Sequence, residues 1–108
     1  MNRKLDSFFN PKSIALVGAS QKEDSVGYRL LSNIIKSEFS GNIYPINPKY
    51  DLCQGIRCFK QVQDLPEIPQ LVMIAIPAKL VLQNIKDCVN FGVKNFYIIS
   101  SGFGELGE

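Results

Sequence analysis

The chain has 108 residues, 45% of them hydrophobic and 20% charged, a composition typical of one folded domain rather than of a disordered chain. Its net charge of +2 is too small to indicate a nucleic-acid surface, and no apolar run approaches the ~18 residues that a membrane-spanning helix needs. The N-terminal residues also lack the apolar core of a secretory signal peptide. We therefore expect a cytoplasmic protein that binds neither nucleic acid nor membranes.

Two residue types restrict the chemistry further. The chain contains no histidine, which excludes Ser-His-Asp, Cys-His and His-metal sites built within it. Its three cysteines form no CxxC pair, and an odd count argues against a disulfide framework or a zinc site. We expect Cys58 and Cys88 to be buried as small apolar residues, and Cys53 to lie in an exposed loop.

The first predicted elements are a lead-in and a buried strand. Residues 1–12 are expected to contain a short helical turn, with Phe8 and Phe9 packing against the domain. An apolar run at residues 14–17 predicts the first strand, which stops at Gly18.

A helix follows after a loop over residues 18–24. Apolar residues recur at helical spacing from Val26 onward, which predicts a helix over residues 26–38 with Ser25 as its N-cap and Gly41 just past its end. Nucleotide-binding folds use this order of strand, tight loop and helix N-terminus, because the free amide groups at the start of a helix attract phosphate.

The middle of the chain predicts one regular strand and several turns. The second strand covers residues 43–46 and is interrupted by Pro45, and residues 47–51 form a turn-rich loop. Residues 57–59 are at most a short edge strand, and the proline-rich residues 65–69 form a rigid connector.

The last third predicts a strand and then a helix. The apolar run at residues 71–76 predicts a strand that is buried on both faces. Pro77 is expected at the first position of a helix over Ala78–Phe91, which Gly92 ends.

A strand over residues 96–99 and a loop over 100–104 complete the alternation, which predicts a doubly wound, parallel α/β sheet with right-handed crossovers. The loops after the four main strands are expected to gather at the C-terminal edge of the sheet, where such folds bind ligands. Because no final helix and strand follow, we expect a sheet truncated at its C-terminal end, with residues 1–108 as the N-terminal part of a larger protein.

The loops lack the pattern of NAD-binding folds. Ser20 stands where the second glycine of GxGxxG would follow, and the next glycine is Gly27. After the second strand, Asn47, Pro48 and Lys49 stand where NAD folds place an acidic residue for the ribose hydroxyls. A lysine there indicates a phosphate partner, with a solvated surface lysine as the plain alternative.

Five segments together resemble one family, the CoA-binding domain of ADP-forming acyl-CoA synthetases. They are SIALVGAS at 13–20, SVGYRLL at 25–31, GNIYPINPK at 41–49, IAIPA at 74–78 and SSGFG at 100–104. The same domain opens the succinyl-CoA synthetase α subunit and occurs in related protein-lysine acetyltransferases. The resemblance covers residues 8–107 and implies a Rossmann-like fold that binds CoA.

The resemblance also implies where CoA lies. The loop after the first strand and the following helix start would hold the phosphates, the loop after the second strand would line the nucleotide, and the segment from residue 76 would flank the adenine or the pantetheine arm. The loop at residues 101–103 would lie near the thiol end. The implied binding residues are Gly18, Ala19, Ser20, Ser25, Gly27, Asn47, Pro48, Lys49, Ile76, Pro77, Ala78, Ser101, Gly102 and Phe103.

Specific roles follow for some of these residues, and each has a plain structural alternative. Ser20 and Ser25 would donate hydroxyl groups to phosphate, although Ser25 could serve only as an N-cap. Gly18 and Gly27 would let the backbone approach the ligand closely, although Gly18 could serve only a sharp turn and Gly27 only helix–sheet packing. Lys49 would face a phosphate.

The family's reaction needs more than this chain contains. These synthetases convert acyl-CoA, ADP and phosphate into acid, CoA and ATP through an acyl phosphate and a phosphorylated histidine. The resemblance therefore implies CoA or acyl-CoA binding without catalytic residues here, with phosphohistidine and ATP-grasp domains of the same or a partner chain as partners. The alternatives are a CoA-binding regulatory domain of a protein-lysine acetyltransferase, an NAD(H)-binding domain and a purely structural interaction domain.

Overall fold

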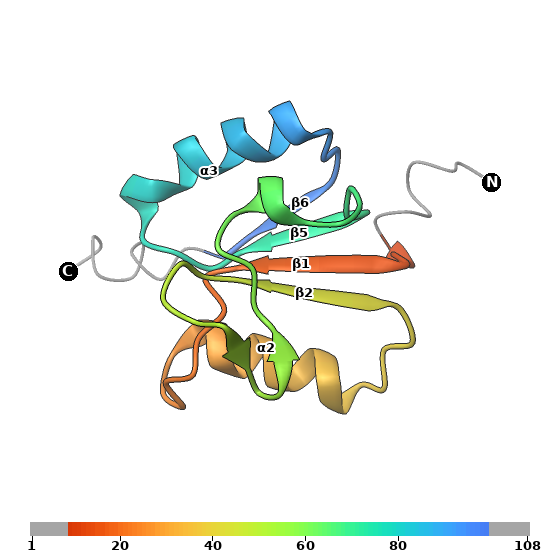
Figure 1. The fold of residues 1–108 in the computed structure, drawn as a ribbon, viewed down its shortest axis with the longest axis vertical. Coiled ribbons are helices and arrows are strands. Elements are labelled where there is room, and N and C mark those ends of the chain that lie inside the picture. The colour runs from red at the N-terminus through yellow and green to blue at the C-terminus, as the bar shows by residue number, and fades with distance from the viewer. Residues whose placement is uncertain (1–8, 100–108) are drawn as a thin grey trace.

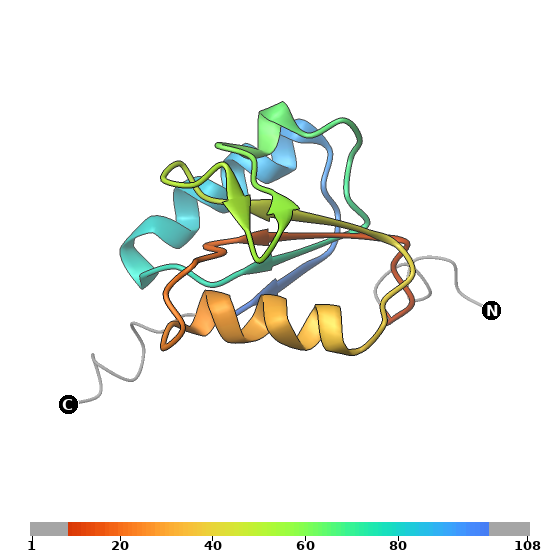
Figure 2. The ribbon, with the colours of Figure 1, turned by 60° about the horizontal axis from the view of Figure 1, so that its bottom comes forward.

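The computed structural model describes residues 9–99, which fold into a four-stranded parallel sheet between helices (Figure 1). Helix α2 covers one face of the sheet, and α3 with the short 3-10 helix η1 covers the other (Figures 1 and 2). In chain order the elements are β1 Ser13–Val17, α2 Val26–Lys36, β2 Asn42–Ile46, β3 Leu52–Cys53, β4 Ile56–Arg57, η1 Val62–Asp64, β5 Leu71–Ile74, α3 Ala78–Phe91 and β6 Phe96–Ile98.

The strand order is β2-β1-β5-β6, and every neighbouring pair is parallel. From β1 the chain crosses through α2 to β2 on one side, and from β5 it crosses through α3 to β6 on the other side. The direction of winding therefore reverses between β1 and β5, which makes the C-terminal ends of these two strands the topological switch point. The predicted doubly wound parallel sheet is confirmed.

The edge strand predicted at residues 57–59 forms only in part. β4 pairs antiparallel with β3 in a separate hairpin, and Phe59 alone makes a parallel bridge to Ile46 of β2. That bridge occupies the place of the third strand in the 3-2-1-4-5 order of Rossmann folds. The hairpin forms because Gln54 and Gly55 both adopt positive φ, at 50° and 82°, the geometry that a two-residue connection needs.

The central strands are apolar throughout because both faces of the sheet are covered. Along β1, Ala15 and Val17 pack in the cluster under α3, whereas Ile14 and Leu16 pack in the cluster under α2. All four residues of β5 are buried in the same alternating way. The prediction of a strand buried on both faces is confirmed, but β5 ends at Ile74, two residues earlier than predicted.

The helix ends differ from the prediction in two places. Helix α2 ends at Lys36, before the predicted residue 38, because Glu38 takes the left-handed conformation with φ at 58°. Pro77 is the N-cap of α3 and not its first helical residue, which is Ala78. Gly92 ends α3 as predicted, with φ at 115° and its amide donating to carbonyl groups of the last turn.

One side-chain prediction was wrong. Cys53 is fully buried, because the β3–β4 hairpin packs over α2, and Gln54 Nε2 donates to the Tyr28 carbonyl oxygen at 3.1 Å. Cys58 and Cys88 are buried as predicted. Phe9 is 68% exposed and lines a surface cavity together with Phe39 and Tyr97, and Phe8 lies outside the described residues.

Candidate functional site

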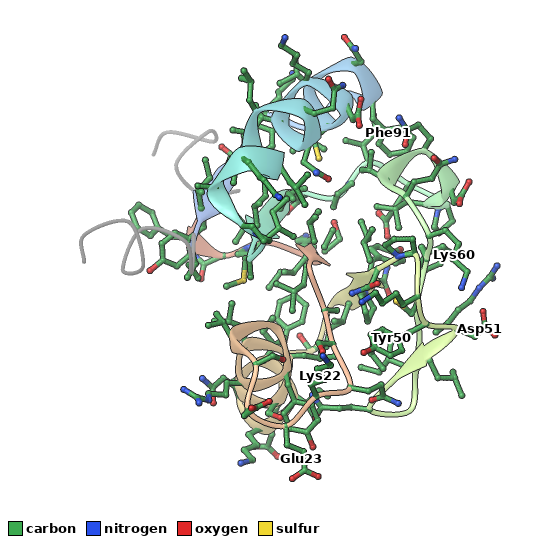
Figure 3. All side chains as sticks on the ribbon, turned by 90° about the vertical axis from the view of Figure 1, so that its left-hand side faces the viewer. Lys22, Glu23, Tyr50, Asp51, Lys60 and Phe91 are labelled. Carbon is green, nitrogen blue, oxygen red and sulfur yellow. The ribbon has the colours of Figure 1, made fainter. Side chains whose placement is uncertain are left out.

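Three loops that follow β1, β2 and β5 are joined by hydrogen bonds at the C-terminal edge of the sheet, which faces the viewer in Figure 3. The Gly18 amide donates to the Ile46 carbonyl oxygen at 3.0 Å, and Asn47 Nδ2 donates to the Ala19 carbonyl oxygen at 2.8 Å. The Ala75 amide donates to the Val17 carbonyl oxygen at 2.8 Å. The sequence-predicted site residues from these three loops are therefore brought together.

Gly18 and Gly27 are required by contacts inside the protein. Gly18 has φ at 95°, and a Cβ atom there would overlap the Ala75 carbonyl group, whose carbon would lie 2.8 Å away. A Cβ atom on Gly27 would overlap the Gly18 carbonyl group, whose carbon would lie 2.9 Å away. These positions favour the structural alternatives of a sharp turn and of helix–loop packing, because the missing Cβ atoms face protein backbone.

Ser25 caps α2 in the predicted way. Its Oγ accepts the Tyr28 amide at 3.1 Å and donates to the Lys22 carbonyl oxygen at 2.7 Å, so both functions of the hydroxyl are occupied. Among residues 9–99, no group accepts the amides of Val26 and Gly27 in the first turn. These two amides, and the positive end of the helix dipole, therefore face the loop without a protein partner.

Ser20 lies in the same loop and is 9% exposed. Its Oγ accepts the Lys22 amide at 3.0 Å, and no acceptor for its hydroxyl hydrogen exists in the described part of the chain. Ala19 beside it is fully buried in the core, and its carbonyl oxygen accepts the hydrogen bond from Asn47.

Asn47 joins the loops through hydrogen bonds of its side chain and its backbone. Besides its bond to Ala19, its Oδ1 accepts the Lys49 amide at 2.8 Å, and its own amide donates to the Phe59 carbonyl oxygen at 2.9 Å. An acidic residue in this place could not donate to Ala19, which explains in local terms why asparagine replaces the acid of NAD folds. Pro48 and Lys49, next along the loop, are exposed.

A cavity of about 260 Å³ opens beside these loops, between the end of β2, η1 and the start of α3. Pro48 and Ile76 line it, as the sequence predicted for site residues, and Pro77 and Ala78 begin the helix that forms one wall. Sequence reasoning missed the other lining residues, which are Ile46, Lys60, Gln61, Val62, Gln63, Leu80, Asn84 and Asp87. Ser101, Gly102 and Phe103 lie outside the described residues.

A larger cavity, of about 970 Å³, lies at the opposite edge of the sheet. Lys12, Phe39, Leu71 and Tyr97 are among its lining residues, and none of the predicted site residues touches it. Size alone therefore does not mark the site, whereas the smaller cavity lies at the ends of β2 and β5, near the switch point, and has Lys60 in its lining.

The thiols are unsuited to nucleophilic catalysis. Burial raises the pKa of Cys53 to about 12 and that of Cys88 to about 11, and it also raises the pKa of Cys58.

Among residues 9–99, no group of three His, Cys, Asp or Glu residues could hold a metal ion. No helix in the same part of the chain is long and apolar enough to cross a membrane.

Known proteins resemble this chain along most of its length. Residues 12–105 match the family described as CoA binding domain. The α subunit of acetate–CoA ligase [ADP-forming] I of Pyrococcus furiosus is 42% identical over 108 residues, which cover 96% of this chain and 23% of the relative. A trans-feruloyl-CoA synthase from an unknown prokaryotic organism is 38% identical over 107 residues, which cover 99% of this chain and 15% of that relative.

A solved structure agrees with these sequence matches. The dinucleotide-forming acetyl-coenzyme A synthetase 1 of Ca. Korarchaeum cryptofilum, in complex with phosphate and ADP, superposes with a TM-score of 0.88 at 41% identity. The match covers 95% of this chain and 22% of that one, so the chain spans less than a quarter of the length of these relatives. Neither an NAD(H)-binding domain nor an acetyltransferase is favoured by these matches, and the chain belongs to the CoA-binding domain family of ADP-forming acyl-CoA synthetases.

Proposed function

We propose that this chain is the N-terminal domain of an ADP-forming acyl-CoA synthetase, and that CoA lies across the C-terminal edge of its sheet. The observation that carries this proposal is the convergence of three hydrogen-bonded loops at the switch point between β1 and β5, in a chain whose residues 12–105 match the family. Doubly wound sheets bind their ligands at that point.

The diphosphate of CoA is assigned to the start of α2. The amides of Val26 and Gly27 and the hydroxyl hydrogen of Ser20 are among the donors that have no protein acceptor within residues 9–99, and the helix dipole adds positive potential. Ser25 keeps its role as N-cap, since a phosphate could take its hydrogen only by displacing the Lys22 carbonyl group. Gly18 and Gly27 shape the loop and make no room of their own for ligand.

The adenosine end of CoA is assigned to the smaller cavity. Pro48, Ile76 and Leu80 give it an apolar lining that suits a purine ring, and Asn84 offers an amide. Lys49 follows Pro48 on an exposed loop, where its ammonium group can meet a phosphate in solvent. The pantetheine arm then runs past the start of α3.

The reaction of the whole protein requires partners outside this chain. The phosphohistidine and ATP-grasp domains of the same or a partner chain supply the catalytic residues. Two of the matched relatives are named for different acids, acetate and ferulate, although each resembles this chain along nearly all of its length. Acyl selectivity is therefore assigned to the other domains, and CoA recognition to this one.

Isothermal titration with CoA and with NAD⁺ tests the proposal. CoA is expected to bind, and NAD⁺ to bind much more weakly, because no acidic residue follows β2 to hold its ribose. Replacing Ser20 with Ala removes the free hydroxyl and should weaken CoA binding about tenfold. The matched control Ser37→Ala changes a serine at the far end of α2 and should leave affinity unchanged. Equal binding of NAD⁺ and CoA would contradict the proposal.

A further inference from the structure

Lys60 stands at the border of two neighbouring cavities on the edge of the sheet where the three loops meet. It lines the apolar cavity that also contains Pro48 and Ile76, and it lines a second cavity, of about 450 Å³, together with Asp51 and Arg57. Its Nζ atom lies 2.9 Å from Asp51 Oδ1 and 3.0 Å from the Tyr50 carbonyl oxygen. Figure 3 shows Lys60, Tyr50 and Asp51 on the same side of this edge.

The backbone fixes Lys60 next to the loop that carries Lys49. The Phe59 amide donates to the Pro45 carbonyl oxygen at 2.8 Å, and the Phe59 carbonyl oxygen accepts the Asn47 amide at 2.9 Å. The two lysines therefore extend from adjoining backbone segments, one on each side of this bridge. A ligand that reaches the end of β2 can meet both.

The contact between Lys60 and Asp51 is an exchangeable one. The two groups form an ion pair in which the Lys60 side chain is 49% exposed and the Asp51 side chain is 93% exposed. Exposed pairs of this kind contribute little to stability, because water and salt screen them. Asp51 therefore positions the Lys60 ammonium group but binds it only weakly. A phosphate dianion, with its greater charge, can displace the single carboxylate.

The other charges around Lys60 have partners of their own. The Arg57 guanidinium lies 4.7 Å from the centre of the Phe59 ring. Asp64 accepts a hydrogen bond from Gln61 at 3.3 Å, and Asp87 accepts one from Gln83 at 3.0 Å. Among the groups that line the two cavities, Asp51 is thus the carboxylate in contact with Lys60.

We propose that Lys60 is a second cation for the ribose 3′-phosphate of CoA, and that Asp51 is a positioning residue that competes with this phosphate for it. This inference rests on the assignment of adenosine to the cavity lined by Pro48 and Ile76. It makes Lys60 a specificity-determining residue, because the 3′-phosphate distinguishes CoA from dephospho-CoA and from NAD⁺. Removing the carboxylate of Asp51 should then strengthen CoA binding, since the ammonium group no longer has to leave a partner.

The test compares the Kd of CoA with that of dephospho-CoA, by isothermal titration of the full chain and three variants. Lys60→Met keeps the apolar stem and should weaken CoA about tenfold while dephospho-CoA is unchanged. Asp51→Asn should tighten CoA about threefold and leave dephospho-CoA unchanged. Asp51→Asn should have no effect when Lys60→Met is already present, because Asp51 acts through Lys60. Lys36→Met, at the far end of α2, is the matched control and should change neither ligand.

Two outcomes would overturn the inference in different ways. If CoA binds but Lys60→Met weakens CoA and dephospho-CoA equally, Lys60 does not read the 3′-phosphate, and the proposed function stands without it. If the unaltered chain binds neither ligand, the proposed function fails and the inference fails with it. Urea midpoints equal to that of the unaltered chain show that each exposed substitution leaves the fold intact.

Discussion

Replacing Gly18 with alanine tests how closely the loop after β1 approaches β5. Gly18 and Gly55 both have positive φ, at 95° and 82°, so an alanine at either position carries backbone strain of about 1–2 kcal/mol. At Gly55 a new Cβ atom meets nothing within 4 Å, whereas at Gly18 it overlaps the Ala75 carbonyl group. The Ala75 amide is bonded to Val17, so the strands cannot separate without losing that bond.

The two substitutions share the backbone strain, so their destabilising effects differ only by the steric overlap at Gly18. Overpacking costs about 1–3 kcal/mol, which predicts a total loss of about 2–5 kcal/mol for Gly18→Ala against about 1–2 kcal/mol for Gly55→Ala. Urea unfolding followed by circular dichroism measures both free energies of unfolding. Equal losses in the two variants would refute the close contact, and with it the argument that Gly18 serves the fold and not the ligand.

Leu31 is fully buried under the sheet, so Leu31→Ala should cost about 2–5 kcal/mol of unfolding free energy, whereas Leu82→Ala on α3, 64% exposed, should change it by less than about 0.5 kcal/mol. A hydrogen bond from Tyr44 lowers the pKa of Glu67, so Tyr44→Phe should raise that pKa in an NMR titration. Burial raises the pKa of Cys88 from about 9 to about 11, so the folded state binds its proton more tightly. The contribution of this thiol to the free energy of unfolding should be fully present below pH 9 and should be lost as the pH rises from 9 through 11. Cys88→Ala should therefore reduce the fall in the free energy of unfolding over that pH range.

Features decided by residues adjacent in sequence could be predicted. The apolar runs that became β1 and β5 were visible because both faces of a parallel sheet are covered. Ser25 caps α2 and Gly92 ends α3 through bonds to residues within four positions. The order of these elements was sufficient to predict the doubly wound sheet and the edge where the loops meet.

Contacts between distant segments could not be read from the sequence. Cys53 sits among polar and turn-forming residues and was expected to be exposed, yet the hairpin folds onto α2 and buries it. Lys60 lines the candidate site because one bridge at Phe59 holds its backbone beside β2, a contact with no local signature. Asn47 was expected to line the nucleotide, and no local pattern indicated that its side chain also joins two loops.

A crystal structure of the chain with bound CoA tests the central claim most directly. The account predicts diphosphate oxygens within hydrogen-bond distance of the Val26 and Gly27 amides and of Ser20 Oγ, with the adenine ring against Pro48 and Ile76. Diphosphate bound in the larger cavity at the opposite edge of the sheet, or bound with those amides and Ser20 left in solvent, would contradict it.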